Sequence, residues 1–240
     1  MKKELKKRII TSILLFLLVI FCIFTNWPTY LFLLIIFSGI SASEFSNLIF
    51  LASLSSSKST FTKKWISYEG LFRIIFAIYM FFVFLLMAVD LGNLGPVFVT
   101  YILLICISSD VGGYVIGKVV GGKKLTKISP NKTISGSIAS FCFSIIPLLL
   151  FHNLNQSEYV YSFNNFLLCL EISFVCQSGD IFISYIKRKA KVKDTGKILP
   201  GHGGLLDRID GIIFAIPFVW IHNNGLVAYF KIIKGALSGL

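Results

Sequence analysis

Long apolar runs separated by short polar loops dominate the chain. Six runs are long enough, or nearly so, to cross a hydrocarbon core about 30 Å thick, which takes roughly 20 residues of helix. They cover residues 9–24, 30–54, 71–89, 95–109, 134–152 and 163–186. A seventh run, 211–222, is short for a full crossing, and the topology after residue 205 stays open. The pattern predicts an all-α, polytopic membrane protein with about seven to eight transmembrane helices.

Lys and Arg residues gather on alternate loops. Clusters precede the first run and separate the second from the third, the fourth from the fifth and the sixth from the seventh, and the intervening loops have none. This positive-inside pattern predicts that the N terminus and the basic loops are cytoplasmic. Topology therefore explains the net charge of +12, which comes from 23 Lys and Arg against 11 Asp and Glu. No nucleic-acid partner is needed.

Composition narrows the class of protein further. With 55% hydrophobic and 14% charged residues, the chain is neither a soluble globule nor a disordered chain. The five Cys residues lie in apolar runs without zinc or disulfide spacing. Cys169 and Cys176 are seven residues apart on one helical face, and we expect them to pack as small hydrophobes. The first run resembles a signal peptide, but Thr25-Asn26-Trp27-Pro28 lacks a small-residue cleavage site, which predicts a retained helix.

Ionisable residues at membrane depth indicate where chemistry takes place, because each costs about 2.5–3.5 kcal/mol on insertion scales. Four carboxylates lie in the apolar runs or at the end of one: Glu44, Asp110, Glu171 and Asp180. Asp180, Ser184 and Lys187 are spaced i, i+4 and i+7, which places them on one helical face. The spacing predicts an inward-facing polar stripe. An Asp180–Lys187 pair that only caps the helix end is the alternative.

The segment after the sixth run combines bases, glycines and acids. Lys187, Arg188 and Lys193 precede a stretch, 196–204, in which four of nine residues are Gly, so that backbone N–H groups can approach an anion closely. The flanking acids are Asp194, Asp207 and Asp210. Carboxylates hold hard divalent cations, and cations neutralise phosphates. The segment therefore favours phosphoryl or nucleotidyl transfer in a polar cavity on the cytoplasmic side.

Two blocks of residues carry a family resemblance. The first block consists of Ser184-Tyr185-Ile186-Lys187-Arg188, Lys193-Asp194 and His202-Gly203-Gly204-Leu205-Leu206-Asp207-Arg208-Ile209-Asp210. The second consists of Asp110, Tyr114, Gly117, Gly121-Gly122-Lys123 and Ser129-Pro130-Asn131-Lys132-Thr133-Ile134-Ser135-Gly136. Together they resemble the CDP-diacylglycerol synthases, or phosphatidate cytidylyltransferases. The family usually has an acid at Ser135 and Ala at Gly113. The clear resemblance covers roughly 104–211, which divides the chain into N-terminal hairpins, 1–103, and a catalytic region, 104–240.

The resemblance implies an enzyme of phospholipid biosynthesis. It would join CTP to phosphatidate in the bilayer, with Mg²⁺, and release CDP-diacylglycerol and diphosphate. A CTP-dependent lipid kinase of the polyprenol or phytol type is the alternative function, and a transporter is disfavoured because no matching halves are visible. With no extra soluble domain or transit peptide, a bacterial inner membrane is the expected location, with the site facing the cytoplasm. The oligomeric state stays open, with a homodimer as one option.

Roles for individual residues follow from the resemblance and from charge. The expected metal ligands are Asp180 and Asp207, with Asp194 and Asp210 in reserve, because close carboxylates in hydrocarbon repel each other unless a cation lies between them. The expected catalytic set is Asp180, Asp207, Lys187, Arg208 and Ser184. Residues expected to bind substrate are Ser129, Lys132, Thr133, Arg188, Lys193, His202, Gly203, Gly204 and Asp110. For Ser129, Lys132 and Thr133, a helix N-cap with topology charge is the alternative.

Overall fold

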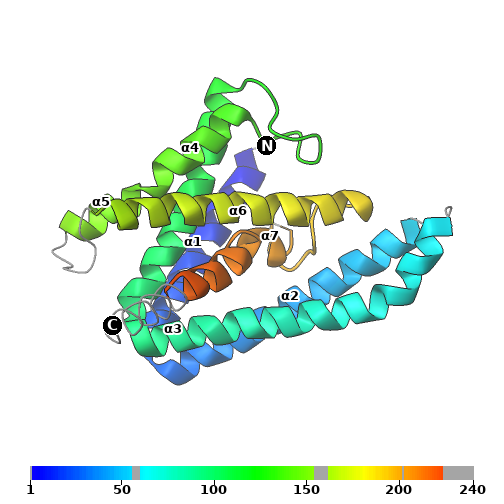
Figure 1. The fold of residues 1–240 in the computed structure, drawn as a ribbon, viewed down its shortest axis with the longest axis horizontal. Coiled ribbons are helices and arrows are strands. Elements are labelled where there is room, and N and C mark those ends of the chain that lie inside the picture. Colours follow the sequence, from blue (N-terminus) through cyan, green and yellow to red (C-terminus); the bar gives the residue numbers. More distant parts are fainter. Residues whose placement is uncertain (1, 56–59, 154–161, 202, 224–240) are drawn as a thin grey trace, which may run out of the picture.

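The structure is a computed structural model that describes residues 2–55, 60–153, 162–201 and 203–223. Its helices in chain order are α1 (Lys2–Thr25), α2 (Trp27–Ser55), α3 (Thr60–Val120), α4 (Ile134–Ser144), α5 (Ile146–Asn153), α6 (Phe163–Lys189) and α7 (Leu206–Ile209). One more helix covers Ile212–Asn223. The described residues form no β-strand beyond two isolated bridges. The predicted all-α class is confirmed (Figure 1).

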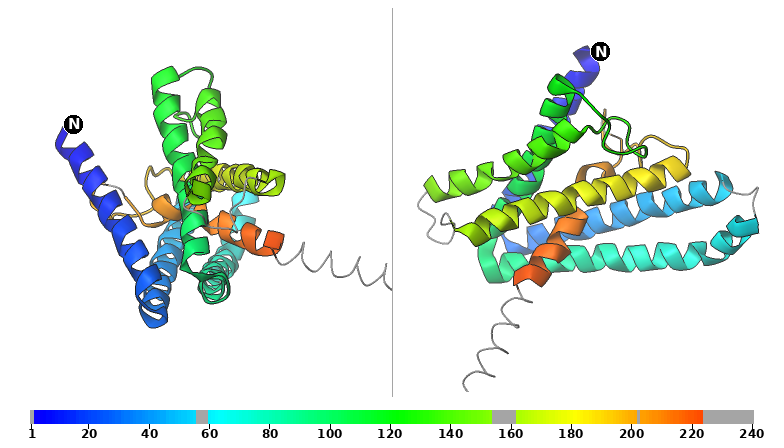
Figure 2. Two further views of the ribbon diagram at one scale, coloured as in Figure 1. Left: turned by 90° about the vertical axis from the view of Figure 1, so that its left-hand side faces the viewer. Right: turned by 45° about the horizontal axis from the view of Figure 1, so that its top comes forward.

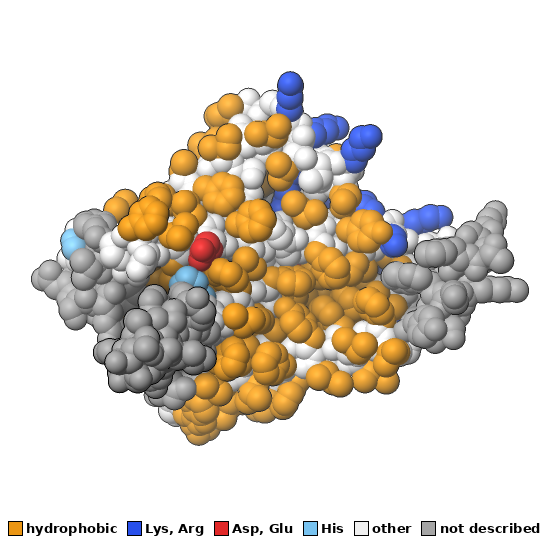
Figure 3. Space-filling view, in the orientation of Figure 1, with side chains coloured by type: hydrophobic (Ala, Val, Ile, Leu, Met, Phe, Trp, Pro, Cys, Tyr) orange, Lys and Arg blue, Asp and Glu red, His pale blue; other side chains and the backbone are white. Residues whose placement is uncertain are grey.

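Length and composition mark the molecule as a multi-pass membrane protein. Five helical spans are long and apolar enough to cross a bilayer: Trp27–Ser55, Gly70–Asp90, Gly95–Val120, Ile134–Asn153 and Phe163–Lys189. Shorter apolar helices cover Ile10–Thr25 and Ile212–Asn223. On the face shown in Figure 3, hydrophobic side chains cover most of the surface, whereas Lys and Arg gather at the top and upper right. The predicted total of seven to eight crossings stays a prediction.

Helix α3 comprises two spans joined at a kink. Gly95 has φ 82° and ψ 172°, and Pro96 follows it, so regular hydrogen bonding is interrupted there. The second span continues to Val120. Asp110 therefore lies well inside this helix, whereas the apolar run alone predicted an end at residue 109. The glycines of its last turns pack closely against α4.

Glycines allow α3 and α4 to approach each other closely. A Cβ atom added to Gly136 would lie 2.7 Å from the Gly113 carbonyl oxygen and 3.2 Å from the Gly117 Cα atom. Small residues at such crossings let two backbones meet in a membrane. This contact fixes the start of α4, and with it the loop that contains Lys132.

Substitution of Gly136 by Ala is expected to lower thermal stability. The added methyl group would force α3 and α4 apart, and overpacking of this kind costs about 1–3 kcal/mol. The matched control is Gly39→Ala, because a Cβ atom at exposed helical Gly39 would meet no atom within 4 Å. Thermal-shift measurements in detergent should show a lower Tm for Gly136→Ala alone. Equal Tm values for the two variants would contradict the close contact.

Helix α6 lies between two hydrophobic cores. Ile183 and Ile186 pack into a core shared with α1, α2 and the first half of α3. Cys169, Ile172 and Cys176 pack into a second core with the second half of α3 and α5. The expected packing of these cysteines as hydrophobes is thus observed. Because both cores hold α6, the polar residues near its C-terminal end occupy a rigid position.

Candidate active site

The predicted site residues come from segments on one side of the molecule. The loop between α3 and α4 and the loop between α6 and α7 both lie on the side where the N terminus is found (Figure 2, right). We call residues 190–205 the signature loop. It follows the basic last turn of α6 and leads into α7, which carries Asp207 and Arg208. Residues far apart in the sequence are thereby brought to a common face.

Asp180 lies at the centre of the polar contacts of α6. Its carboxylate forms an ion pair with Lys132, which comes from the loop before α4. The Ser184 hydroxyl lies 3.5 Å from Asp180 Oδ1, as expected for residues one helical turn apart. The Asp210 carboxyl lies close enough to Asp180 for the two side chains to interact. The predicted contact between Asp180 and Ser184 is therefore present. The cation that pairs with Asp180 is Lys132, and Lys187 pairs with Asp207, so the alternative of an Asp180–Lys187 pair does not apply.

Three carboxylates, Asp110, Asp180 and Asp210, form what we call the acidic cluster. Asp110 lies close enough to Asp180 for their charges to interact, and Lys132 and Arg208 offset this repulsion. Asp210 is 8% exposed. Burial, then the charges of Asp180 and Asp110, raise the pKa of the Asp210 carboxyl well above its ordinary value, and Lys187 opposes the shift. A bound proton or cation would relieve this repulsion.

Asp207 has different partners from those expected. Its Oδ1 atom accepts a 2.6 Å hydrogen bond from Lys187 Nζ, and Oδ2 lies 2.7 Å from the Thr195 nitrogen and 3.1 Å from the Gly204 nitrogen. Both oxygens thus bind groups of the protein. The structure places Asp210 beside Asp180, and α7 turns the side chain of Asp207 towards the signature loop. Metal binding by each of these acids stays a prediction.

A polar cavity of about 360 Å³ lies in the signature loop. Its lining residues are Lys193, Asp194, Gly196, Lys197, Leu199, Pro200, Gly201, Gly203 and Arg208. Gly201 and Gly203 have φ values of 78° and 86°, a conformation that other residues rarely adopt. Three cations around one small cavity suit an anionic ligand. The structure thus brings together the predicted residues Lys193, Asp194, Gly203 and Arg208.

Other predicted residues lie at the edges of this arrangement. Thr133 is the N-cap of α4, and its hydroxyl accepts a 3.1 Å hydrogen bond from the Gly136 nitrogen. The helix N-cap given above as the alternative to substrate binding is therefore present at Thr133. The Ser129 carbonyl accepts a 3.0 Å hydrogen bond from the Lys132 nitrogen. Arg188 is exposed and does not line the cavity, and His202 lies outside the described residues. Binding roles for these residues stay predictions.

Several polar residues near the site were not assigned a role from the sequence. Lys197 lines the cavity beside Lys193. Gln177, one turn before Asp180, accepts a 2.5 Å hydrogen bond from the Ser137 hydroxyl and so connects α6 to α4. Glu44 contacts the signature loop from α2. The position of Glu44 as an acid within an apolar run indicated that it has a partner or a function. The sequence did not indicate which residues Glu44 contacts.

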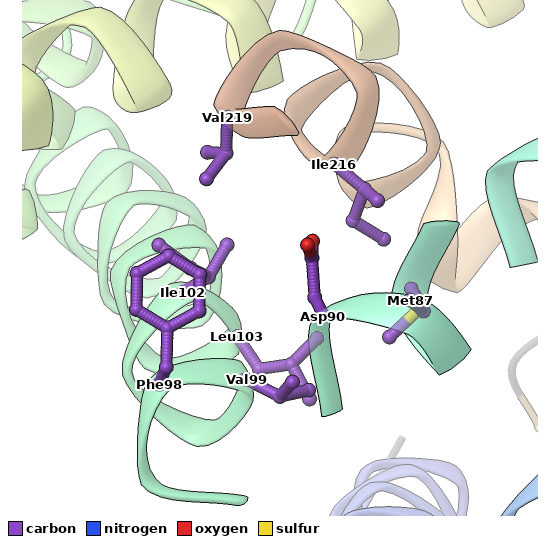
Figure 4. A pocket seen from close by; sticks show the side chains of 8 residues that line it. All are labelled: Met87, Asp90, Phe98, Val99, Ile102, Leu103, Ile216 and Val219. Atoms are coloured by element: carbon purple, nitrogen blue, oxygen red, sulfur yellow. The ribbon is translucent and has the colours of Figure 1, made fainter. Parts of the chain in front are cut away.

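Asp90 is another buried acid that sequence reasoning missed. Its carboxylate points into a small cavity of about 20 Å³ between the two halves of α3 and the helix Ile212–Asn223 (Figure 4). The other lining residues, Met87, Phe98, Val99, Ile102, Leu103, Ile216 and Val219, are all apolar. The volume suits about one water molecule. This cavity lies apart from the acidic cluster and shares no lining residue with the signature loop.

The amino-acid sequence of this chain resembles those of known proteins. A family model described as the cytidylyltransferase family matches residues 8–224, which is most of the chain. The chain belongs to the cytidylyltransferase family. The match includes the N-terminal hairpins as well as the two motif blocks, so α2 and its buried Glu44 lie within the family region.

Curated relatives of this cytidylyltransferase-family chain share one name, phosphatidate cytidylyltransferase. The chain is 38% identical over 136 residues to a phosphatidate cytidylyltransferase of Bacillus subtilis, and the match covers 55% of this chain and 50% of the relative. It is 42% identical over 127 residues to that of Staphylococcus aureus (52% and 48%) and 40% identical over 126 residues to that of Rickettsia bellii (49% and 53%). The chain spans about half the length of the curated relatives it matches.

Proposed function

We propose that this chain is a phosphatidate cytidylyltransferase that makes CDP-diacylglycerol and diphosphate from CTP and phosphatidate. The observation that carries the proposal is the adjacency of the acidic cluster and the cationic cavity. Arg208 lines the cavity, and its charge also acts on Asp110. Lys187 pairs with Asp207 and acts on Asp210. A nucleotide triphosphate and a lipid phosphate can therefore bind side by side. The names of the relatives support the same reaction.

The two regions supply different parts of the reaction. A phosphatidate phosphate oxygen attacks the α-phosphorus of CTP, the bond from that phosphorus to the bridging oxygen breaks, and diphosphate leaves. Lys193, Lys197 and Arg208 hold the β- and γ-phosphates in the cavity. Lys132, which lies beside Asp180, orients the attacking phosphate. Catalysis then consists mainly of positioning and charge neutralisation.

The acidic cluster has the donor chemistry for Mg²⁺. Asp180 and Asp210 approach closely enough to form a hydrogen bond, which requires a proton on one of them. Asp180 and Asp210 would hold a divalent cation in place of that proton. Among the described residues, no group of three His, Cys, Asp or Glu side chains is placed to hold a metal. Mg²⁺ binds to one or two carboxylates plus phosphate and water, so the proposed site needs only two of these acids. Its contribution when bound is to neutralise the phosphates and the leaving group.

The proposed location is a bacterial inner membrane, with the site on the cytoplasmic side. CTP is a soluble cytoplasmic anion, and the basic loops that surround the site are the ones that the positive-inside rule places in the cytoplasm. Phosphatidate reaches the same face from the bilayer, because its phosphate stays at the membrane surface. An accessibility assay with a cysteine placed at Lys197 would test the orientation: labelling only from outside intact cells would contradict it.

A labelling experiment tests the reaction directly. Purified protein in detergent is incubated with phosphatidate, Mg²⁺ and CTP labelled at either the α- or the γ-phosphate. The proposal expects α-label in a lipid product and γ-label in diphosphate. Label that enters lipid only from the γ-phosphate would identify a lipid kinase. No labelled lipid from either form would overturn both functions.

Neutralisation of Lys197 by Lys197→Gln is expected to raise the KM for CTP about ten- to a hundredfold, with little change in the KM for phosphatidate. A hydrogen bond from a charged group contributes about 1.5–3 kcal/mol, which converts to this range. Lys191→Gln is the matched control, because Lys191 is an exposed cation of the same loop that does not line the cavity. Initial rates at varied CTP would measure the effect. Equal KM values for both variants would remove Lys197 from the CTP site.

A further inference from the structure

Glu44 is a buried acid that none of the steps above uses. It belongs to α2, in the N-terminal half of the chain, and is 3% exposed. A carboxylate is rarely buried to this extent unless it has several hydrogen-bond donors. Its donors all come from the signature loop and the start of α7, more than 150 residues away in the sequence.

Both oxygens of Glu44 bind this distant segment. Oε1 accepts a 3.0 Å hydrogen bond from the Leu205 nitrogen, and Oε2 accepts a 2.9 Å hydrogen bond from the Leu206 nitrogen. The Thr195 hydroxyl lies 3.0 Å from Oε2. One side chain on α2 therefore contacts the loop that forms the cationic cavity at two places, at Thr195 and at its end.

Two glycines of the loop lie directly against this carboxylate. A Cβ atom on Gly196 would lie 2.3 Å from Glu44 Oε1, and one on Gly204 would lie 2.4 Å from Oε2. These glycines are required for close approach, since neither has a positive φ. The loop is thus shaped to fit around Glu44. The close contact with Glu44 explains why these two positions are glycine, which phosphate binding alone does not explain.

Thr195 links Glu44 to Asp207. Its hydroxyl lies 3.0 Å from Glu44 Oε2 and 3.0 Å from Asp207 Oδ2, yet a hydroxyl has only one proton to donate. Asp207 already accepts from Lys187 and from two backbone nitrogens. The Thr195 hydroxyl therefore donates its proton to Glu44 Oε2. Because the Thr195 backbone nitrogen donates to Asp207 Oδ2 at 2.7 Å, hydrogen bonds still connect α2 through Thr195 and Asp207 to Lys187 on α6.

We propose that Glu44 is a positioning residue that holds the signature loop in the shape that binds the phosphates of CTP. The role in CTP binding rests on the proposed function, whereas the role in holding the loop does not. Glu44 itself touches the loop and not the substrates. It acts through Thr195, Gly196 and Gly204, which set the positions of the neighbouring cavity residues Lys193 and Lys197.

Limited trypsin digestion tests the structural part without any assay of activity. In Glu44→Gln, whichever way the amide is turned, at least one of the Leu205 and Leu206 nitrogens loses its acceptor. We expect cleavage after Lys193 and Lys197 to become at least about tenfold faster in the folded protein. Cleavage after Lys123 and Lys124, in the α3–α4 loop, should keep its rate and serves as an internal control. Equal rates at Lys193 and Lys197 in both proteins would overturn the proposal.

Kinetics test the link to CTP. Glu44→Gln and the milder Thr195→Val should raise the KM for CTP at least about tenfold and leave the KM for phosphatidate within about twofold, and Thr195→Ser should restore the wild-type value. The control is Ser41→Ala, one turn earlier on α2, since the buried Ser41 hydroxyl has no hydrogen-bond partner in the described structure. An equal rise in both KM values, or a fall in kcat alone, would contradict positioning of the CTP site.

The two tests separate the possible failures. An inactive wild-type protein whose Glu44→Gln variant is still cleaved faster in the signature loop would overturn the proposed function and retain Glu44 as the residue that holds the loop. An active wild-type protein with unchanged cleavage and unchanged KM in both variants would overturn the role of Glu44 alone. If Glu44→Gln does not fold, Thr195→Val decides, because it removes one hydroxyl and leaves both backbone hydrogen bonds to Glu44 in place.

Discussion

Asp180→Asn is expected to lower kcat about a hundred- to a thousandfold and to leave the fold intact. The substitution removes the charge that pairs with Lys132 and one of the two carboxylates offered to a divalent cation. Loss of one preorganised electrostatic group typically has an effect of this size. Stability should change little, because the Asp180–Lys132 pair is partly exposed and because the repulsion between Asp180 and Asp210 is relieved at the same time.

The matched control for Asp180→Asn is Glu171→Gln. Glu171 is a carboxylate on the same helix, but it lies towards the opposite end, where its Oε2 atom is 3.4 Å from His222 Nδ1. Formation of labelled lipid from α-labelled CTP measures kcat, and a thermal shift in detergent measures stability. We expect Glu171→Gln to keep at least about half of the wild-type kcat. Full activity in Asp180→Asn would exclude Asp180 from the reaction.

Asp207→Asn is expected to lower both activity and stability. The side chains of Asp207 and Lys187 are only 6% and 12% exposed, so the substitution leaves Lys187 as a nearly buried cation without its partner. Removing one member of a buried pair costs about 3–5 kcal/mol. The new amide group would also direct its N–H₂ donors towards the N–H groups of Thr195 or Gly204. We expect kcat to fall at least about a hundredfold and Tm to fall by several degrees.

The double variant Asp207→Asn/Lys187→Met separates these two effects. Met is close in size to the Lys stem and removes the uncompensated charge, so most of the lost Tm should return. Activity should not return, because the double variant lacks both charges at the proposed site. Recovery of activity would show that the pair is only structural. A Tm for Asp207→Asn equal to that of the wild type would show that the Lys187 contact does not form.

Local sequence patterns were sufficient for the helices and for part of the site. Hydrophobic length predicted the spans because a helix must satisfy its own backbone groups in hydrocarbon, whatever its neighbours are. The i, i+4 spacing predicted the contact of Ser184 with Asp180 for the same reason: helical geometry alone sets it. The extension of α3 beyond residue 109 was not predicted. The close contact of Gly113 and Gly117 with Gly136 forms between two helices, so the hydrophobic pattern of one segment does not show it.

The sequence by itself determined that acids, bases and glycines between residues 180 and 210 would meet near one membrane face. Only the tertiary structure decided which of them pair. Asp180 lies beside Asp210 and Lys132, whereas Asp207 binds Lys187 and the signature loop, because α7 turns two acids three residues apart towards different neighbours. Glu44 joined the arrangement from a distant helix. Such contacts depend on how separate helices pack against one another. The spacing of residues within one segment of the chain does not determine that packing.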